Sequence, residues 1–260
     1  MGRIMQHIGT IYLVGAGPGP VDLLTLRAAR LISEARVIVH DGLIGPDILG
    51  LARPDARLIS VAKQRARHTL PQEEINNLLV REALQGHDVV RLKGGDPFIF
   101  GRGGEEAETA RAAGVPVEVV PGISAANGAA AASGIALTHR DASSIVSFVA
   151  GQCKGLSEQD WSGLAGKGRT LVIYMGVSTA AAIADKLMAD GLAPDMPVAV
   201  IENAARPEMR VLRGLLAGLP ELVEAQAVQS PALIVIGEVT AREDIAVAAL
   251  AQTTKEQVAL

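Results

Sequence analysis

Two glycine-rich turns are the features of this chain best suited to chemistry, because backbone without side chains lets a ligand approach closely. The first turn reads Gly-Ala-Gly-Pro-Gly-Pro over residues 15–20 and follows the apolar stretch 10–14. A glycine-rich turn between a strand and a helix is typical of dinucleotide-binding sites. Here, however, Pro18 and Pro20 lack the N–H groups that would bind a pyrophosphate. By itself, this turn favours a tight connection that permits close helix–sheet packing.

A second turn of the same kind changes that interpretation. Residues 93–104 read Lys-Gly-Gly-Asp-Pro-Phe-Ile-Phe-Gly-Arg-Gly-Gly and directly follow another apolar stretch, 88–92. Open α/β sheets bind ligands at the carboxyl ends of their strands, so the two turns predict one shared crevice. Neither turn ends in the Gly-Lys-Ser/Thr of a phosphate-binding P-loop, which argues against a nucleoside triphosphate. A ligand that contains adenosine without phosphates fits better.

Alternating apolar segments predict the elements that position these turns. We expect strands at residues 10–14, 36–40, 57–61, 88–92 and 115–120. Helices are expected between them, one capped by Asp22, one at 71–85 ended by Gly86, and one at 103–113. Strands interleaved with helices predict a mostly parallel sheet. A helix of small residues at 125–132, ended by Gly134, follows the last of these strands.

A polar stretch without clear periodicity, residues 135–144, indicates a domain boundary. We therefore expect an N-terminal α/β domain over residues 1–140, which carries both turns, and a C-terminal α/β domain over residues 141–260. The second domain should contain a helix at 178–189, ended by Gly191, and strands at 145–150, 170–175, 198–202 and 232–237. The predicted fold class is thus α/β with two domains.

The composition excludes several classes of protein. Apolar residues make up 49% of the 260, and 24 Lys and Arg against 28 Asp and Glu give a net charge of −4. This argues against disorder and against any general attraction to nucleic acid or an anionic membrane. The most apolar stretch, 125–137, is shorter than the roughly 20 residues of a membrane helix. Five histidines without metal-ligand spacing and the single Cys153 lead us to expect no metal site and a cytoplasmic protein.

Several segments together resemble the tetrapyrrole methylase superfamily, and within it the uroporphyrinogen-III C-methyltransferases. They are Val14–Gly19 with Asp22–Leu26, Arg91–Arg102, Val120–Ser124, Leu137–Arg140, Tyr174–Gly176 and Ser230–Ala232. The resemblance runs from about residue 11 to residue 239. The stretch Arg91–Arg102 is the most specific, because related methylases that act later in corrin synthesis usually have a different residue pair before Gly-Asp-Pro.

The resemblance implies a cofactor cleft between the two domains, which takes S-adenosylmethionine and yields S-adenosylhomocysteine. The implied cofactor contacts are Pro18, Gly94, Gly95, Asp96, Ile99, Ser124, Ala125, Met175 and Ala204. At the last position the chain departs from the family, since Glu202–Ala205 reads Glu-Asn-Ala-Ala where Glu-Arg-Gly-Thr is common. Ala204 can still make a backbone contact, but a backbone angle that needs glycine would be strained there.

Asp41 and Lys63 match the positions of the family's acid and base groups. Asp41 is expected to take the proton that leaves the methylated macrocycle or to stabilise its positive charge, and Lys63 to donate a proton or anchor the substrate. Without the resemblance, a loop cap and a solvated charge would be the simpler interpretations. Carboxylates of the substrate are expected to bind Arg65, Arg67, Arg102 and Arg140, with His68, Arg91, Arg206 and Arg210 as further cations near predicted loops.

The resemblance implies transfer of two methyl groups to C2 and C7 of uroporphyrinogen III, giving precorrin-2 for cobalamin or sirohaem synthesis. It also implies a homodimer, and we expect a monofunctional enzyme without nucleic-acid or membrane partners. Three alternatives stay open. The chain could methylate a later precorrin or another substrate of the superfamily, act as an NAD-dependent dehydrogenase with Asp41 on the ribose, or bind a cofactor without catalysis.

Overall fold

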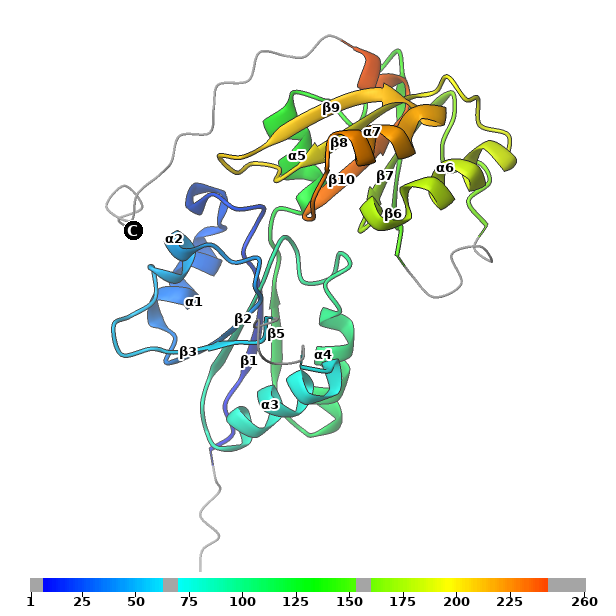
Figure 1. The fold of residues 1–260 in the computed structure, drawn as a ribbon. Helices are drawn as coiled ribbons and strands as arrows, with labels where there is room; N and C mark the ends of the chain where they lie inside the picture. Colours follow the sequence, from blue (N-terminus) through cyan, green and yellow to red (C-terminus); the bar gives the residue numbers. More distant parts are fainter. Residues whose placement is uncertain (1–6, 63–69, 153–159, 243–260) are drawn as a thin grey trace, which may run out of the picture. The chain divides into compact units, whose positions relative to one another are not determined.

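The computed structural model describes residues 7–62, 70–152 and 160–242, in two compact units (Figure 1). The first unit ends at Ser124 and the second begins at Ala125. Both consist of a five-stranded sheet with helices, which confirms the predicted α/β class. Lys63, Arg65, Arg67, His68 and Cys153 lie outside the described residues. Within the described ranges, no helix is both long and apolar enough to cross a bilayer.

The sheet of the first unit is entirely parallel, whereas the sequence predicted a mostly parallel one. Its strands are β1 (Ile11–Gly15), β2 (Val37–His40), β3 (Arg57–Ser60), β4 (Val89–Lys93) and β5 (Val117–Val120), in the order β3-β2-β4-β1-β5. The carboxyl ends of all five strands therefore lie along one edge. The segments that follow β2, β4, β1 and β5 are neighbours along that edge.

Helices cover both faces of this sheet. On one face, α1 (Leu26–Glu34) and α2 (Pro46–Leu49) pack against apolar side chains that include Val14, Ile38 and Leu92. On the other face, α3 (Gln72–Leu84) and α4 (Gly103–Ala112) lie over Leu13, Val39 and Val89 (Figure 1).

Asp22 does not cap α1, contrary to the prediction. It lies in a 3-10 turn, Val21–Leu23, that precedes the helix. Thr25 caps the helix instead, because its side chain accepts a hydrogen bond from the amide of Ala28 at 3.1 Å.

The sheet of the second unit is mixed. Its strands are β6 (Ser143–Ala150), β7 (Gly168–Tyr174), β8 (Pro197–Glu202), β9 (Arg210–Leu215) and β10 (Ala232–Ile236), in the order β6-β7-β10-β8-β9. Strands β6 and β7 are parallel, and the remaining pairs are antiparallel. The sequence did not predict β9, since this edge strand is half exposed and its polar residues interrupt any apolar run.

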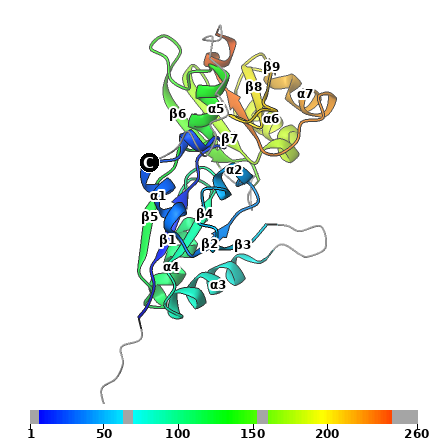
Figure 2. The same ribbon diagram turned by 90° about the vertical axis from the view of Figure 1, so that its left-hand side faces the viewer.

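Helices α6 (Ala180–Ala189) and α7 (Leu219–Ala225) cover one face of the second sheet, and α5 (Ala125–Ser133) covers the other (Figure 2). Short 3-10 turns precede α6 and α7 and follow β10, at Val177–Thr179, Leu216–Gly218 and Glu238–Ala241. Ala126 and Ala129 of α5 pack against Val172 and Ile201. The division between the units therefore falls before α5, whereas the sequence placed it after Arg140. Most of the stretch 135–144 has irregular structure because residues 135–142 connect α5 to β6 within the second unit.

Candidate active site

The first candidate residues meet at the carboxyl edge of the parallel sheet. Pro18 follows β1, Asp41 follows β2, the turn Gly94–Asp96 follows β4, and Ser124 lies after β5. Because these strands are adjacent, the sheet brings together residues that are far apart in the sequence. This edge is where open α/β sheets bind ligands.

The two glycine-rich turns are hydrogen-bonded to each other. Gly95 donates its amide to the Gly17 carbonyl at 2.8 Å, and Gly17 donates in return to Gly95 at 3.1 Å. The amide of Ala16 donates to the carbonyl of Lys93 at 2.8 Å. The turns thus form one rigid backbone surface, in agreement with the predicted shared location.

Close backbone contact explains several of the glycines. A Cβ atom on Gly15 would lie 2.6 Å from the amide nitrogen of Gly122, and a Cβ atom on Gly122 would lie 2.3 Å from the carbonyl oxygen of Gly95. No side chain fits at such distances. Gly17 and Gly95 have positive φ angles, 69° and 68°, which favour glycine independently.

Asp96 connects two of the loops at this edge. Its Oδ1 accepts a hydrogen bond from the amide of Phe98 at 2.8 Å, and its Oδ2 accepts one from the amide of Gly122 at 3.1 Å. Asp96 therefore holds the second glycine turn against the segment after β5. A direct contact of Asp96 with the cofactor stays a prediction.

The loop after Asp96 exposes apolar surface and has unusual backbone geometry. Phe98, Ile99 and Phe100 are exposed, Ile99 to 37%. Phe100 and Arg102 have φ angles of 52° and 58°, in the left-handed region that side chains disfavour. Backbone strain and exposed apolar side chains together are typical of a ligand-binding loop.

Asp41 is the half-buried end of a chain of ion pairs. Its Oδ1 accepts a hydrogen bond from Nη2 of Arg91 at 2.6 Å, and its side chain is 31% exposed. Its amide donates to the carbonyl of Leu92 at 3.2 Å, which fixes the backbone of Asp41 beside β4. A carboxylate held in this way and still open on one side can accept a proton from a bound substrate.

Behind Asp41 lies a buried polar cluster that consists of Arg91, Lys93 and Glu106. Oε1 of Glu106 accepts hydrogen bonds from Nε of Arg91 at 2.9 Å and Nζ of Lys93 at 3.0 Å. Burial, and after it the charge of Arg91, lower the pKa of Lys93, although Glu106 and Asp41 partly offset this. A role for Lys93 and Glu106 was not predicted from the sequence. The available signal was a pair of cations at alternate positions of an otherwise apolar strand.

The candidate substrate arginines differ in their availability. Arg91 was expected near a loop, but it is 2% exposed inside β4, so it cannot reach a substrate carboxylate. Arg210 opens β9 and donates to the buried carboxylate of Glu202. Arg102 is exposed and forms two hydrogen bonds with Glu105, whose carboxylate raises the pKa of Arg102. Arg140 is exposed in a turn of the second unit.

In the second unit, the candidate residues lie at the start of α5 and at the ends of β7 and β8. Ala125 begins α5, and the next amide, that of Ala126, donates to the Tyr174 hydroxyl at 3.0 Å. Met175 follows β7 with a φ angle of 54° and is 45% exposed. The sequence suggested no role for the Tyr174 hydroxyl, which holds α5 next to Met175.

Ala204 follows β8 in the stretch that departs from the family pattern. The positive φ angles in this stretch belong to its two neighbours, Asn203 (49°) and Ala205 (61°). The backbone strain expected from the missing glycine is therefore present, but it lies at the residues on either side of Ala204. The backbone at Ala204 itself can be used for a contact.

The residues present fit S-adenosylmethionine. The half-buried Gly94 has ordinary φ, and a Cβ atom there would lie at 3.4 Å from the Leu43 side chain, so neither strain nor crowding demands a glycine. The missing side chain leaves space for a ligand. Ile99 and Met175 each offer exposed apolar surface of the kind that an adenosyl group contacts.

The geometry weighs against a pyrophosphate in the first turn. The amides of Ala16 and Gly17 already donate to Lys93 and Gly95, and Pro18 and Pro20 have no amide hydrogen. Few donors remain for phosphate oxygens. Among the described residues, no group of three or more His, Cys, Asp or Glu side chains is arranged to hold a metal ion.

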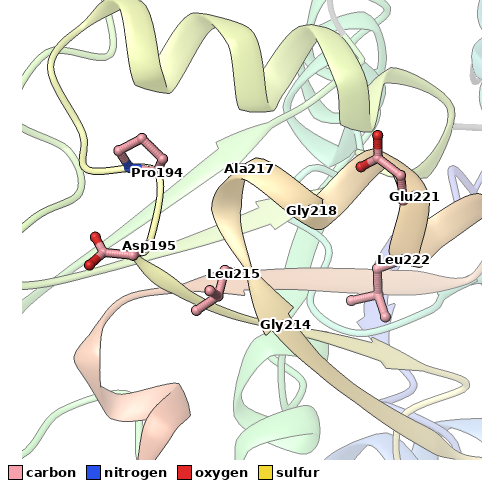
Figure 3. Close-up of a pocket in the computed structure, with 8 residues that line it drawn as sticks. All are labelled: Pro194, Asp195, Gly214, Leu215, Ala217, Gly218, Glu221 and Leu222. Atoms are coloured by element: carbon pink, nitrogen blue, oxygen red, sulfur yellow. The ribbon is translucent and has the colours of Figure 1, made fainter.

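A pocket of about 640 Å³ lies elsewhere in the second unit (Figure 3). It is lined by residues of the segment before β8 and of β9 and α7, among them Pro194, Leu215 and Leu222. None of the candidate site residues that the structure describes borders it. We assign it no function.

Comparison with known proteins identifies the family. Residues 10–220 match the model of the tetrapyrrole (corrin/porphyrin) methylases. The chain belongs to the tetrapyrrole methylases. A solved uroporphyrin-III C-methyltransferase of Thermus thermophilus, complexed with S-adenyl homocysteine, is 39% identical with a TM-score of 0.77, over 93% of this chain and 98% of that one. A cobalt precorrin-4 methyltransferase, 24% identical with a TM-score of 0.78 over 89% and 95% of the two chains, shares the fold.

Curated relatives extend beyond the matched region. The siroheme synthase of Salmonella typhimurium is 52% identical over 240 residues, which are 92% of this chain and 52% of that protein. The chain thus spans about half the length of the curated relatives it matches. Membership in the tetrapyrrole methylases confirms the expected enzyme class, methyl transfer with S-adenosylmethionine as cofactor.

Proposed function

We propose that this tetrapyrrole methylase transfers two methyl groups from S-adenosylmethionine to C2 and C7 of uroporphyrinogen III, giving precorrin-2. The observation that carries the proposal is the position of Asp41 beside the paired glycine turns at one sheet edge. The likeness over nearly the full length of a uroporphyrin-III C-methyltransferase supports the substrate. The likeness to siroheme synthases supports a place in sirohaem synthesis, with cobalamin synthesis as a second destination of precorrin-2.

The cofactor residues of the proposal come from both units. In the first unit they are Pro18, Gly94, Gly95, Asp96, Ile99 and Ser124, and in the second they are Ala125, Met175 and Ala204. Asp96 acts at least by holding its loop, because both of its carboxylate oxygens accept backbone amides. When bound, S-adenosylmethionine supplies an activated methyl group on a sulfonium, and a neutral sulfide leaves.

Asp41 is proposed to accept the proton that leaves the macrocycle after methylation has made it cationic. A new C–CH3 bond at a pyrrole carbon gives the macrocycle a positive charge, which disappears when a proton leaves. The Asp41 carboxylate accepts that proton, and its bond to Arg91 holds it at the sheet edge. Orientation of the pyrrole carbon toward the methyl group can supply about 7–11 kcal/mol of the barrier reduction.

The cationic residues complete the proposal. Lys63 is assigned proton donation or substrate anchoring, and Arg65, Arg67, Arg102 and Arg140 are assigned to the substrate carboxylates. Arg102 exchanges its exposed Glu105 partner for a substrate carboxylate, an exchange that is inexpensive for a surface ion pair. A homodimeric state and a cytoplasmic location belong to the same proposal.

Substrate assays test the proposal against its alternatives. The purified chain is incubated with S-adenosylmethionine and either uroporphyrinogen III or a later precorrin, and released S-adenosylhomocysteine is measured. Turnover of the later precorrin alone would contradict the proposed substrate. Calorimetry should show binding of S-adenosylhomocysteine and none of NAD, and binding without any turnover would favour a non-catalytic module.

The role of Asp41 has its own test. Asp41→Asn keeps the shape of the side chain and removes its charge, so turnover should fall about 10²–10⁴-fold, the usual contribution of an acid–base group. The affinity for S-adenosylhomocysteine should stay unchanged. Near wild-type turnover would return Asp41 to a loop-capping role, and loss of cofactor binding would make it a cofactor ligand.

A further inference from the structure

We propose that Arg91 is a positioning residue that orients the Asp41 carboxylate for catalysis, and that Glu106 and Lys93 hold Arg91 in place. The inference rests on the proposed function, because it lets Arg91 act through Asp41. It gives a role to a buried cluster of charged side chains, none of which is among the proposed cofactor or substrate residues.

Arg91 is placed by the alternation of β4. Val89, Arg91 and Lys93 point to the face of the sheet that α3 and α4 cover, where Val89 packs with Leu13 and Val39. In the register of the sheet, Arg91 is the partner of Val39, two residues before Asp41. From this position the buried Arg91 side chain contacts both Glu106 of α4 and Asp41 at the carboxyl edge.

Each nitrogen of the Arg91 guanidinium has a partner. Nη2 donates to Oδ1 of Asp41 at 2.6 Å, Nε to Oε1 of Glu106 at 2.9 Å, and Nη1 to the Leu92 carbonyl at 3.3 Å. The planar group cannot rotate without breaking at least one of these bonds. The direction of the bond to Asp41 is therefore determined from inside the protein.

Glu106 anchors the inner end of the cluster. It lies in the first turns of α4 with a side chain that is 0% exposed, and its Oε1 accepts from Arg91, Lys93 and, at 3.2 Å, Nε2 of Gln72. The four charged groups balance, with Arg91 and Lys93 against Glu106 and Asp41. Of these four, Asp41 is the one that is partly exposed, at 31%.

Stability alone explains this arrangement poorly. A buried ion cluster can often be replaced by apolar residues of similar volume without loss of stability. Here the cluster costs desolvation of three side chains and leaves Oε2 of Glu106 buried without a hydrogen-bond partner among the residues that the structure describes. It ends at the carboxylate to which the proton-accepting role is assigned. A defined orientation of that carboxylate is what the cluster provides.

A double-mutant cycle in turnover tests the proposal in the full chain. If Arg91 acts through Asp41, Arg91→Gln should lower kcat by about 10²-fold, as expected for a misplaced catalytic group. KM and the affinity for S-adenosylhomocysteine should not change. The double variant Asp41→Asn/Arg91→Gln should be no slower than Asp41→Asn, within about twofold, because the removed residues act as one unit.

Two further variants control for effects on folding. Arg91→Lys keeps the charge but not the planar fork, so its kcat should lie between those of the wild type and Arg91→Gln, and it can replace Arg91→Gln in the cycle. Arg57→Gln removes another Arg–Glu pair of the same unit, that with Glu82, and should reduce stability while kcat stays unchanged.

Three outcomes would overturn the inference. If the two substitutions multiply their effects, Arg91 does not act through Asp41, while the proposed function stands. Wild-type kcat in both Arg91 variants would likewise contradict positioning and leave the proposed function intact. If Asp41→Asn itself retains wild-type turnover, the role of Asp41 in the proposed function is wrong, and the role of Arg91 is wrong with it.

Discussion

The glycines of the two turns and of the segment after β5 are present for different physical reasons. Gly15 and Gly122 face backbone atoms too close for any Cβ, and Gly95 has a φ angle of 68°. Gly94 has neither constraint, because a Cβ atom there would make an ordinary 3.4 Å contact with Leu43. At Gly94, the fold would tolerate a side chain, and we therefore propose that glycine stands there to let a ligand approach.

We predict that Gly94→Ala reduces the affinity for S-adenosylhomocysteine about tenfold or more, which corresponds to about 1.4 kcal/mol of binding free energy. The free energy of unfolding should change by less than about 0.5 kcal/mol. Titration calorimetry and urea unfolding measure the two quantities. Gly122→Ala is the contrasting variant and should unfold at lower urea concentration. Unaltered affinity in Gly94→Ala would remove Gly94 from the cofactor site.

At the scale of elements, four helices end with the same hydrogen-bond pattern. After α3, α4 and α6, a glycine with positive φ follows the helix: Gly86, Gly114 and Gly191, respectively. In each case the amide of the glycine and the amide of the next residue donate hydrogen bonds to carbonyls in the last turn of the helix. After α7 the same position is Ala227, with a φ angle of 47°. Its amide donates to Glu224 at 3.0 Å, and that of Val228 donates to Val223 at 3.0 Å.

Ala227→Gly should therefore stabilise the protein. A left-handed conformation costs a residue with a Cβ atom about 1–2 kcal/mol, and the greater freedom of glycine in the unfolded chain offsets about 0.5–1 kcal/mol of the gain. We expect a net increase of about 0.5–1 kcal/mol in the free energy of unfolding, measured in urea. Gly191→Ala, the reverse change after α6, should lower it. A decrease for Ala227→Gly would show that the Ala227 methyl group contributes more than its backbone strain costs.

A second prediction at this scale concerns the pair that joins α3 to β3. Glu82 accepts hydrogen bonds from Arg57 and, at 3.0 Å, from His87. Burial opposes ionisation of the Glu82 carboxyl, but these bonds outweigh it and hold its pKa below the usual 4.5. Because the pKa is lower in the folded protein, this contribution to stability is present above pH 4.5 and is lost as the pH falls through the folded-state pKa.

Glu82→Gln should thus be less stable than the wild type by about 1.5–3 kcal/mol at pH 7, the range for a hydrogen bond to a charged group. Urea unfolding of both proteins between pH 7 and pH 3 should show the difference shrink below pH 4.5. If the difference in unfolding free energy stays constant over this pH range, the loss of stability comes from altered packing of the side chain and not from loss of its charge.

The sequence predicts elements best where apolar periodicity and glycine signals agree. The parallel strands, the helix ends at Gly86 and Gly191 and the start of α5 were predicted for this reason. The half-exposed β9 and the cap at Thr25 were missed, because an edge strand has little apolar signal and two nearby residues compete as caps.

Part of the candidate site could likewise be predicted from the sequence, and part could not. Asp41 and the glycine turns could be placed at one edge, because carboxyl ends of parallel strands coincide. The link from Arg91 to Asp41 and Glu106 could not be predicted, since it depends on which face of β4 each side chain occupies and on strand order.

At the scale of the whole molecule, each unit has its own apolar cores, so each sheet edge is supported independently. The family resemblance leads us to predict a homodimer. Light scattering at micromolar concentration should give twice the chain mass of 26.9 kDa. A mass near 26.9 kDa would contradict this.

The most direct test of the central claim is to identify the product carbon by carbon. The chain is supplied with uroporphyrinogen III and S-adenosylmethionine labelled with ¹³C in its methyl group, and the tetrapyrrole product is examined by NMR. We predict two labelled methyl groups of equal intensity, on C2 and C7, and two molecules of S-adenosylhomocysteine released per macrocycle. Label on any other carbon, or no transfer to uroporphyrinogen III while S-adenosylhomocysteine still binds, would contradict the assignment.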